Sequence, residues 1–144
     1  MPFPGTRTLH PDWSTHHRAT VAGAMGATCE LYGAMGPGVY DPATMTTTAT
    51  RGPALWAGPC RVQTYAGQAT AGDQAGQEVT TRDYLVQLDE TGEPVPVQLA
   101  EGWAVVVTVC PNDASLIGRP LPVTDVMRGS ERAARDLVVS DNLG

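Results

Sequence analysis

The hydrophobic period of the chain changes near Gly26, and this change restricts the fold more than any other feature of the sequence. Over residues 11–25, apolar side chains recur at helical spacing, beginning with Trp13. This predicts a short helix with one apolar stripe, capped by Asp12 and ending near Gly26. From residue 27 onward, apolar side chains tend to alternate with polar ones, which is the period of a strand.

Strand-like segments separated by turn signals fill the rest of the chain. With one helix and no alternation of strands and helices, they predict a mainly β fold: a small β-barrel or sandwich of about six to seven strands, with a short N-terminal helix and long loops. We expect residues 1–26 to form an N-terminal arm and helix, and residues 27–144 to form the β-barrel domain. The expected strands, besides a ribbon within 35–52, are 27–33, 54–65, 78–89, 103–109, 119–126 and 134–141.

Two long polar stretches interrupt this pattern. Residues 35–52 are rich in threonine, which predicts an exposed strand or ribbon between two turns. Residues 66–77 are small and polar, which predicts an extended loop without regular structure. Long loops of this kind within a compact domain usually serve function or assembly.

The run WAVVVTV at 103–109 is the most apolar in the chain and predicts a central strand buried on both faces. It is far too short to cross a bilayer, and no run of eighteen apolar residues exists in the sequence, so we expect no membrane segment. After it, Asn112 and Asp113 can cap one turn of helix.

The charge of the chain argues against nucleic-acid binding by a basic surface. Its nine basic residues are all arginine, and fifteen acids bring the net charge to −6. Affinity for a phosphate backbone comes from cations that displace counterions, which this composition does not supply. Three cysteines without a CxxC pair predict neither a disulfide framework nor a zinc site, and they indicate a reducing, cytoplasmic origin.

Cys60, beside Arg61, is the first candidate for catalysis. A reactive thiol needs a cation or a helix N-terminus near it and a base to take its proton. Neighbouring residues of a strand face opposite sides, so Arg61 points away from Cys60. We therefore predict a buried structural cysteine, and a bulge or bend at Gly58 and Pro59.

The remaining candidates for catalysis or cofactor binding are weaker. His10, His16 and His17 do not have the spacing of three or four positions that a ligand pair on a helix needs, and we expect no acid to complete a metal set. Asp89 and Glu90 flank a turn and are expected to be solvated. The sequence predicts no catalytic residue, no metal, no cofactor and no enzymatic activity.

The order of segments resembles a known family, the head-to-tail stopper (head completion) proteins of long-tailed phages, especially those of actinobacteria. The resemblance covers most of the chain, from HPDWSTHHR and TCELYG through YDPATMTTT, LWAGPCRVQ, EVTTRDYLVQL and WAVVVTV to ARDLVVSD. Its most specific part is NDASLIGRPLPVTDV.

The resemblance implies a virion protein that is made in the host cytoplasm and assembles as a ring with itself, commonly hexameric and otherwise dodecameric. The ring lies at the head-tail interface, with the portal or adaptor ring above it and tail proteins below. It closes the DNA-filled head, gives the tail a docking surface, and lets DNA pass without sequence recognition.

The resemblance also implies roles for particular residues. A loop from each subunit converges on the axis of the ring, and in this chain the gating candidates are Gln68, Thr70, Asp73, Gln74 and Gln77. Contacts with neighbouring subunits or neck partners are expected from Phe3, Leu9 and Trp13 of the N-terminal arm and from Tyr40 of the threonine-rich ribbon.

Two other functions stay open. The chain can instead be an adaptor or tail-completion ring protein of the same neck. A function of a different class is also open: a small-molecule-binding or enzymatic β-barrel with a pocket near Cys60, Tyr84 and Trp103.

Overall fold

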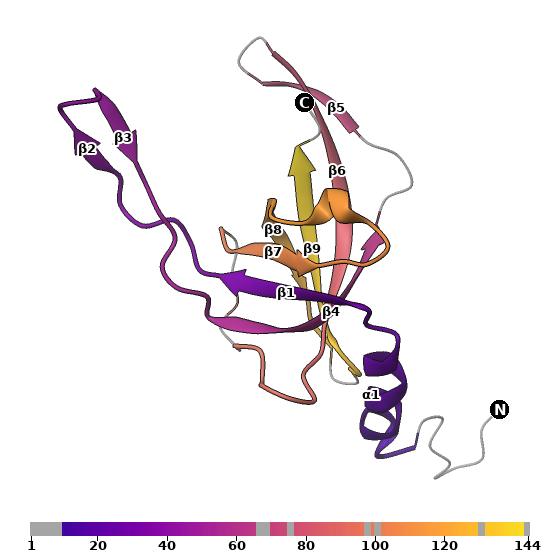
Figure 1. Ribbon diagram of the computed structural model, residues 1–144. Helices are drawn as coiled ribbons and strands as arrows, with labels where there is room; N and C mark the ends of the chain where they lie inside the picture. The colour runs from indigo at the N-terminus through magenta and orange to yellow at the C-terminus, as the bar shows by residue number, and fades with distance from the viewer. Residues whose placement is uncertain are drawn as a thin grey trace.

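The computed structural model describes residues 10–65, 70–74, 77–96, 99, 102–129 and 132–142, with the backbone alone described for 70–74 and 77–79. It shows a mainly β chain in which six antiparallel strands form a closed barrel (Figure 1). The prediction of a small β-barrel with a short N-terminal helix is confirmed.

The elements follow one another in the order that the sequence pattern predicts, with two additions. The predicted ribbon within 35–52 consists of two strands, and one strand forms where we expected a loop. The bounds are α1 Trp13–Gly23, β1 Ala27–Tyr32, β2 Val39–Asp41, β3 Thr46–Thr48, β4 Trp56–Thr64, β5 Thr70–Gln74, β6 Gln77–Leu88, β7 Ala104–Val109, the 3₁₀ turn η1 Ala114–Leu116, β8 Pro120–Met127 and β9 Arg135–Asn142.

The barrel closes because β6 pairs with strands on both of its edges. Around the barrel the order is β4, β1, β7, β8, β9 and β6, and β6 pairs again with β4. The C-terminal half of β6 closes the barrel, since Tyr84–Leu88 pair with β4 on one side and with β9 on the other. Within the described residues, closure gives every strand of the barrel a neighbour on both sides, which is how small antiparallel sheets avoid edge-to-edge aggregation.

The prediction of a loop at 66–77 is wrong for residues 70–74. These residues form β5, which pairs with residues 77–81 of β6 from Thr70↔Thr81 to Gln74↔Gln77. The first residues of β6 do not pair with β4, and β5 pairs with the strand edge that this part of β6 would otherwise leave open. Small polar residues carry no apolar alternation, so their pattern did not reveal this strand.

The helix α1 forms where predicted, but none of its residues is buried, and Trp13 and Val21 of the apolar stripe are half-buried. Asp12 is its N-cap residue, yet its side chain makes no capping hydrogen bond. By contrast, the predicted cap of η1 is confirmed, because Asp113 Oδ1 accepts a hydrogen bond from the Ser115 N–H at 3.0 Å. No helix in the described part of the chain is long and apolar enough to cross a membrane.

The core lies inside the barrel and consists mainly of aliphatic side chains, together with two thiols and the Trp56 indole. Its largest fully buried side chains are Leu31, Leu88, Leu121, Leu137, Val86, Val105, Val107, Val139, Cys29 and Cys60. The strand β7 is buried on both faces only in its first half, since Ala104 and Val105 are inaccessible whereas Val109 is half-exposed.

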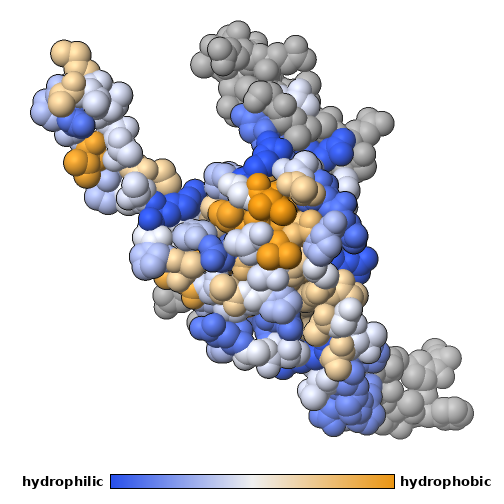
Figure 2. All heavy atoms as spheres, viewed as in Figure 1, coloured by the Kyte–Doolittle hydropathy of each residue, from blue (hydrophilic) through white to orange (hydrophobic). Residues whose placement is uncertain are grey.

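An apolar patch covers the outside of the barrel near the end of β7. Figure 2 shows it over β7 and η1, and the large apolar side chains exposed in this region are those of Val109 and Ile117. Two residues expose little area, so the patch remains within what an ordinary protein surface carries.

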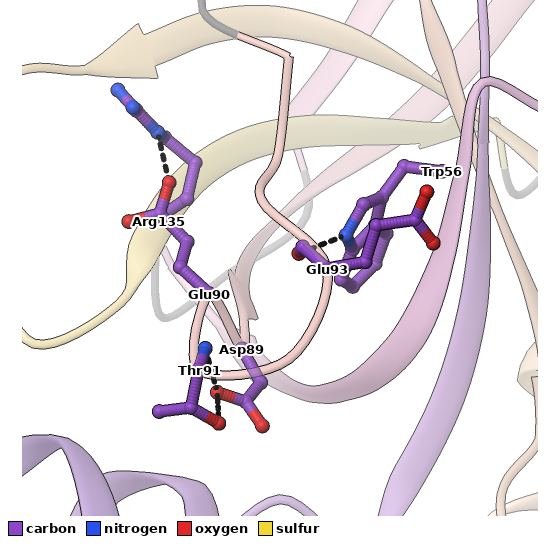
Figure 3. Close-up of polar contacts among 6 residues, drawn as sticks. All are labelled: Trp56, Asp89, Glu90, Thr91, Glu93 and Arg135. Carbon is purple, nitrogen blue, oxygen red and sulfur yellow. Dashed lines mark hydrogen bonds and ion pairs between the residues drawn. The ribbon is translucent and has the colours of Figure 1, made fainter.

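The turn after β6 covers one end of the barrel with Trp56 beneath it (Figure 3). The Trp56 indole N–H donates to the Glu93 carbonyl at 2.8 Å, and the indole is almost fully buried. Glu90 pairs with Arg135 at 3.2 Å, and Asp89 accepts hydrogen bonds from Thr91. The two acids therefore fix the turn, as its composition predicted, although Glu90 is paired rather than freely solvated.

The predicted bulge at Gly58 and Pro59 is wrong, because β4 pairs with β1 without a register shift from Ala27↔Cys60 to Leu31↔Trp56. Gly58 instead makes room for Trp56, since a Cβ atom there would lie 2.7 Å from Trp56 Cζ2. Pro59 is tolerated because its carbonyl accepts from the Asp89 N–H. The N and C=O groups of one strand residue point to the same side, so the missing N–H of Pro59 faces the end of β6 and removes no hydrogen bond to β1.

Candidate functional site

A two-stranded ribbon extends from the barrel between β1 and β4, and it carries much of the exposed apolar surface. β2 and β3 pair with each other over three residue pairs, and all six strand residues are exposed. Figures 1 and 2 show the ribbon standing away from the barrel. An isolated hairpin of this size is marginally stable in water, so it needs support at its base or from a partner.

The base of the ribbon is fastened to the barrel by Arg51. Its Nη1 atom donates to the Gly33 carbonyl and to the Gly102 carbonyl, each at 2.7 Å. Next to it, the Gly36 N–H donates to the Thr50 carbonyl at 2.9 Å. These bonds join both ends of the ribbon to each other and to the segment before β7, so the ribbon leaves the barrel in a defined direction.

The tip of the ribbon has its own local structure. Asp41 Oδ1 accepts from the Ala43 N–H at 2.9 Å, which forms an Asx turn. Met45 has a φ of 54°, a left-handed conformation that is uncommon for such a side chain. Four large apolar side chains of the ribbon are exposed, at 52% for Met35, 70% for Val39, 59% for Tyr40 and 81% for Met45.

The structure describes two of the four expected contact residues, Trp13 and Tyr40. Tyr40 lies on β2 of the exposed ribbon. Trp13 starts α1, is half-buried, and stacks on the His17 ring with 4.6 Å between ring centroids. Phe3 and Leu9 lie outside the described residues.

The expected gating residues belong to the β5–β6 hairpin, which projects from the barrel on a different side from α1 (Figure 1). Thr70, Asp73 and Gln74 lie on β5, and Gln77 begins β6, whereas Gln68 lies outside the described residues. Four of the five thus share one two-stranded projection, although their side chains are not among those described.

A cavity of about 340 Å³ opens beside β4, near the end of α1 and the segment that leads to η1. Cys60 and Tyr84 line it, as the pocket hypothesis expects, but Trp103 does not. Among the described residues that line it there is no histidine. Asp113 is the carboxylate that lines it, and hydrogen bonds from the Ser115 side chain and backbone lower the pKa of Asp113, which makes it a weak base.

Cys60 is a buried structural residue, as predicted. Both Cys60 and Cys29 are inaccessible to solvent, and Arg61 on the opposite face of β4 is exposed. The two thiols interact across the β1–β4 pair, and the hydrogen bond with Cys60, together with burial, raises the pKa of Cys29. The same hydrogen bond lowers the pKa of Cys60, so it is burial, and not a raised pKa, that keeps the Cys60 thiol from reacting.

The expectation that no acid completes a metal set with the histidines is wrong. Ligand atoms of His10, Asp12 and His16 lie within 4.8 Å of one another at the start of α1. The sequence signal was present, because Asp12 and His16 are four positions apart and so face the same side of a helix. The backbone turn that returns His10 to them is not visible in the spacing.

Comparison with known proteins adds a family but no activity. No curated protein matches the chain. A family model matches residues 17–140, from within α1 to within β9, and therefore covers the barrel and both projecting hairpins. The chain accordingly belongs to this family, DUF6093, a family of unknown function.

Proposed function

We propose that the chain is a structural subunit of the phage neck, forming a ring that closes the DNA-filled head and gives the tail its docking surface. The observation that carries this proposal is the β2–β3 ribbon, whose apolar side chains Val39, Tyr40 and Met45 are exposed on a defined projection. An isolated monomer gains nothing from this exposure, whereas a neighbouring subunit would bury it.

Ring assembly accounts for several features together. Each subunit of a ring presents one surface to a different surface of its neighbour, which projecting elements suit. The net charge of −6 and the absence of lysine suit a channel that DNA must slide through, because a basic lumen would hold the phosphates. The β5–β6 hairpin is the candidate for the gate, and Trp13 and Tyr40 are candidates for contacts between subunits or with neck partners.

The test is the assembly state of the ribbon variant Val39→Ser/Tyr40→Ser/Met45→Ser. We expect the native chain to form rings, alone or on the portal of the same phage, in light scattering and negative-stain images. The variant should stay monomeric, and its urea midpoint should equal that of the native chain at concentrations where the native chain is also monomeric, since the residues it alters are exposed. The control Val109→Ser/Ile117→Ser removes exposed apolar side chains from the barrel instead and should assemble normally.

Two results would count against the proposal. A native chain that stays monomeric at high concentration and does not bind the portal rules out a neck ring. If the barrel control fails to assemble while the ribbon variant assembles, the contact surface lies elsewhere on the molecule. Rings that bind only tail proteins, or only portal, would assign the chain to the tail-completion or adaptor tier.

A ligand-binding or enzymatic barrel is the second candidate, and the cavity beside Cys60 and Tyr84 is the observation that favours it. This function predicts that a thiol reagent modifies Cys60 in the native chain. The burial of Cys60 predicts instead that it reacts only on unfolding, with the half-buried Cys110 as the more accessible thiol. Rapid native labelling of Cys60, read by mass spectrometry, would favour the enzyme.

A further inference from the structure

The start of α1 brings three metal-binding side chains together. His10, Asp12 and His16 each offer a ligand atom, and these atoms lie within 4.8 Å of one another. The His10 and His16 rings stack with 5.0 Å between centroids, and Asp12 Oδ2 lies 4.0 Å from His10 Nδ1. All three residues are exposed, so an ion from solvent can reach them.

The backbone explains why residues before and within the helix meet. The Trp13 N–H donates to the His10 carbonyl at 3.0 Å, which folds the chain back over Pro11. The His16 N–H donates to the Asp12 carbonyl at 2.9 Å, so Asp12 and His16 are successive residues on one helical face. The grouping therefore follows from local backbone geometry and not from a chance meeting of long side chains.

Asp12 supplies a second, independent observation. An aspartate at an N-cap normally accepts a hydrogen bond from the free amides of the first turn. In this chain the Asp12 carboxylate makes no such bond and lies beside His10 instead. The carboxylate is thus free of the role that its position predicts, and it faces an imidazole.

The helix itself lacks the usual sources of stability. It has eleven residues, none of them buried, and no acidic residue in its first turn. Isolated helices shorter than about 12–15 residues are marginal in water. A link that ties His10 to the first turn would stabilise this helix without a packed face.

We propose that His10, Asp12 and His16 bind one divalent transition-metal ion, with Zn²⁺ as the best fit, and that the ion clips residue 10 to the start of α1. Two imidazole nitrogens and one carboxylate oxygen suit Zn²⁺, whereas Ca²⁺ and Mg²⁺ prefer oxygen ligands throughout. Zinc bonds of about 2.1 Å place tetrahedral ligand atoms about 3.4 Å apart. Exposed side chains can close to this spacing by small torsional changes, and water completes the fourth position.

The experiment is calorimetric titration of Zn²⁺ into the full-length chain without a histidine tag, near neutral pH. We expect one ion per chain with a dissociation constant of about 1–10 μM, and weaker binding as the pH falls because protons compete for the imidazoles. His10→Gln and His16→Gln should each weaken binding at least about tenfold, and Asp12→Asn should weaken it in the same direction.

His17→Gln is the matched control. His17 neighbours His16, but its ring stacks on Trp13 and its Nδ1 atom lies 2.8 Å from the Trp13 carbonyl, so it should not contribute. Cys110→Ser controls for zinc bound by the half-buried thiol and should bind as the native chain does. NMR spectra should show Zn²⁺ shifting the imidazole signals of His10 and His16.

Three results would overturn the proposal. The first is binding weaker than about 100 μM, which any exposed histidine can give. The second is an equal loss of affinity in His17→Gln and His16→Gln. The third is binding that disappears in Cys110→Ser but persists in His16→Gln, which would place the ion at the thiol. Each readout is independent of ring assembly, so the neck function can stand or fall separately.

Discussion

Replacing Gly58 with alanine should be unusually costly for a change of one methyl group. Gly58 faces the indole of Trp56 two residues earlier on β4, and an added Cβ would lie 2.7 Å from Cζ2 and 2.9 Å from Cη2. The indole cannot move freely, because it is almost fully buried and its N–H donates to the Glu93 carbonyl. The backbone of Gly58 is not in the left-handed region, so the penalty is steric.

The magnitude follows from two contributions. Forcing a methyl group into a packed core costs about 1–3 kcal/mol. Displacing the indole also lengthens its hydrogen bond to Glu93, worth about 1 kcal/mol net. We therefore expect Gly58→Ala to lower the free energy of unfolding by about 2–4 kcal/mol. Gly23→Ala is the control, since nothing lies within 4 Å of a Cβ there, and in a helix it should stabilise by up to about 1 kcal/mol.

The assay is urea denaturation of a double-mutant cycle with Trp56→Phe. A phenyl ring lacks the Cζ2 and Cη2 atoms of the indole, so Gly58→Ala should cost less than about 0.5 kcal/mol in that background. The measurement is interpretable if the m-values stay constant. If the penalty is the same in the Trp56→Phe background as in the native chain, contact with the indole is not its cause and the packing explanation fails.

Two further predictions concern polar contacts. Arg119→Met should lower the free energy of unfolding by about 2–3 kcal/mol, because it leaves the Asp141 carboxylate, 5% exposed and 2.8 Å from Arg119, buried without its cation. Adding Asp141→Asn should recover most of this loss in urea denaturation, and no recovery would show that the charge is not the cause. Ser115→Ala should raise the pKa of Asp113 toward its ordinary value, because the Ser115 side chain is the main cause of the lowered pKa. Because the pKa of Asp113 is lowered in the folded chain, its ionised form stabilises the fold at pH values above the ordinary pKa, and this stabilisation is lost as the pH falls through the lowered pKa. The Ser115→Ala variant should lack the share of this stabilisation that comes from the Ser115 side chain. An NMR titration in which the pKa of Asp113 is the same in the variant and the native chain would contradict this.

The local hydrophobic pattern of the sequence determines much of the fold. Alternation with period 2, and for 103–109 an unbroken apolar run, predicted the barrel strands to within about two residues, because a strand with one face toward the core has its residue type fixed at every second position. The helix was predicted from spacing of the same local kind. The buried state of Cys60 was also predictable, since strand geometry sends Arg61 to the other face.

The tertiary structure alone decided how the strands close and what supports the projections. The pairing of β6 with β4, the bond between Arg51 and the Gly102 carbonyl, and the ion pair of Arg119 with Asp141 join residues 20 to 51 positions apart, about which a local period says nothing. The residues of β5 are small and polar, so the pairing with β6 defines this strand and composition does not. The metal set at α1 is intermediate: the spacing of Asp12 and His16 was visible, but the turn that returns His10 to them is a property of the folded backbone.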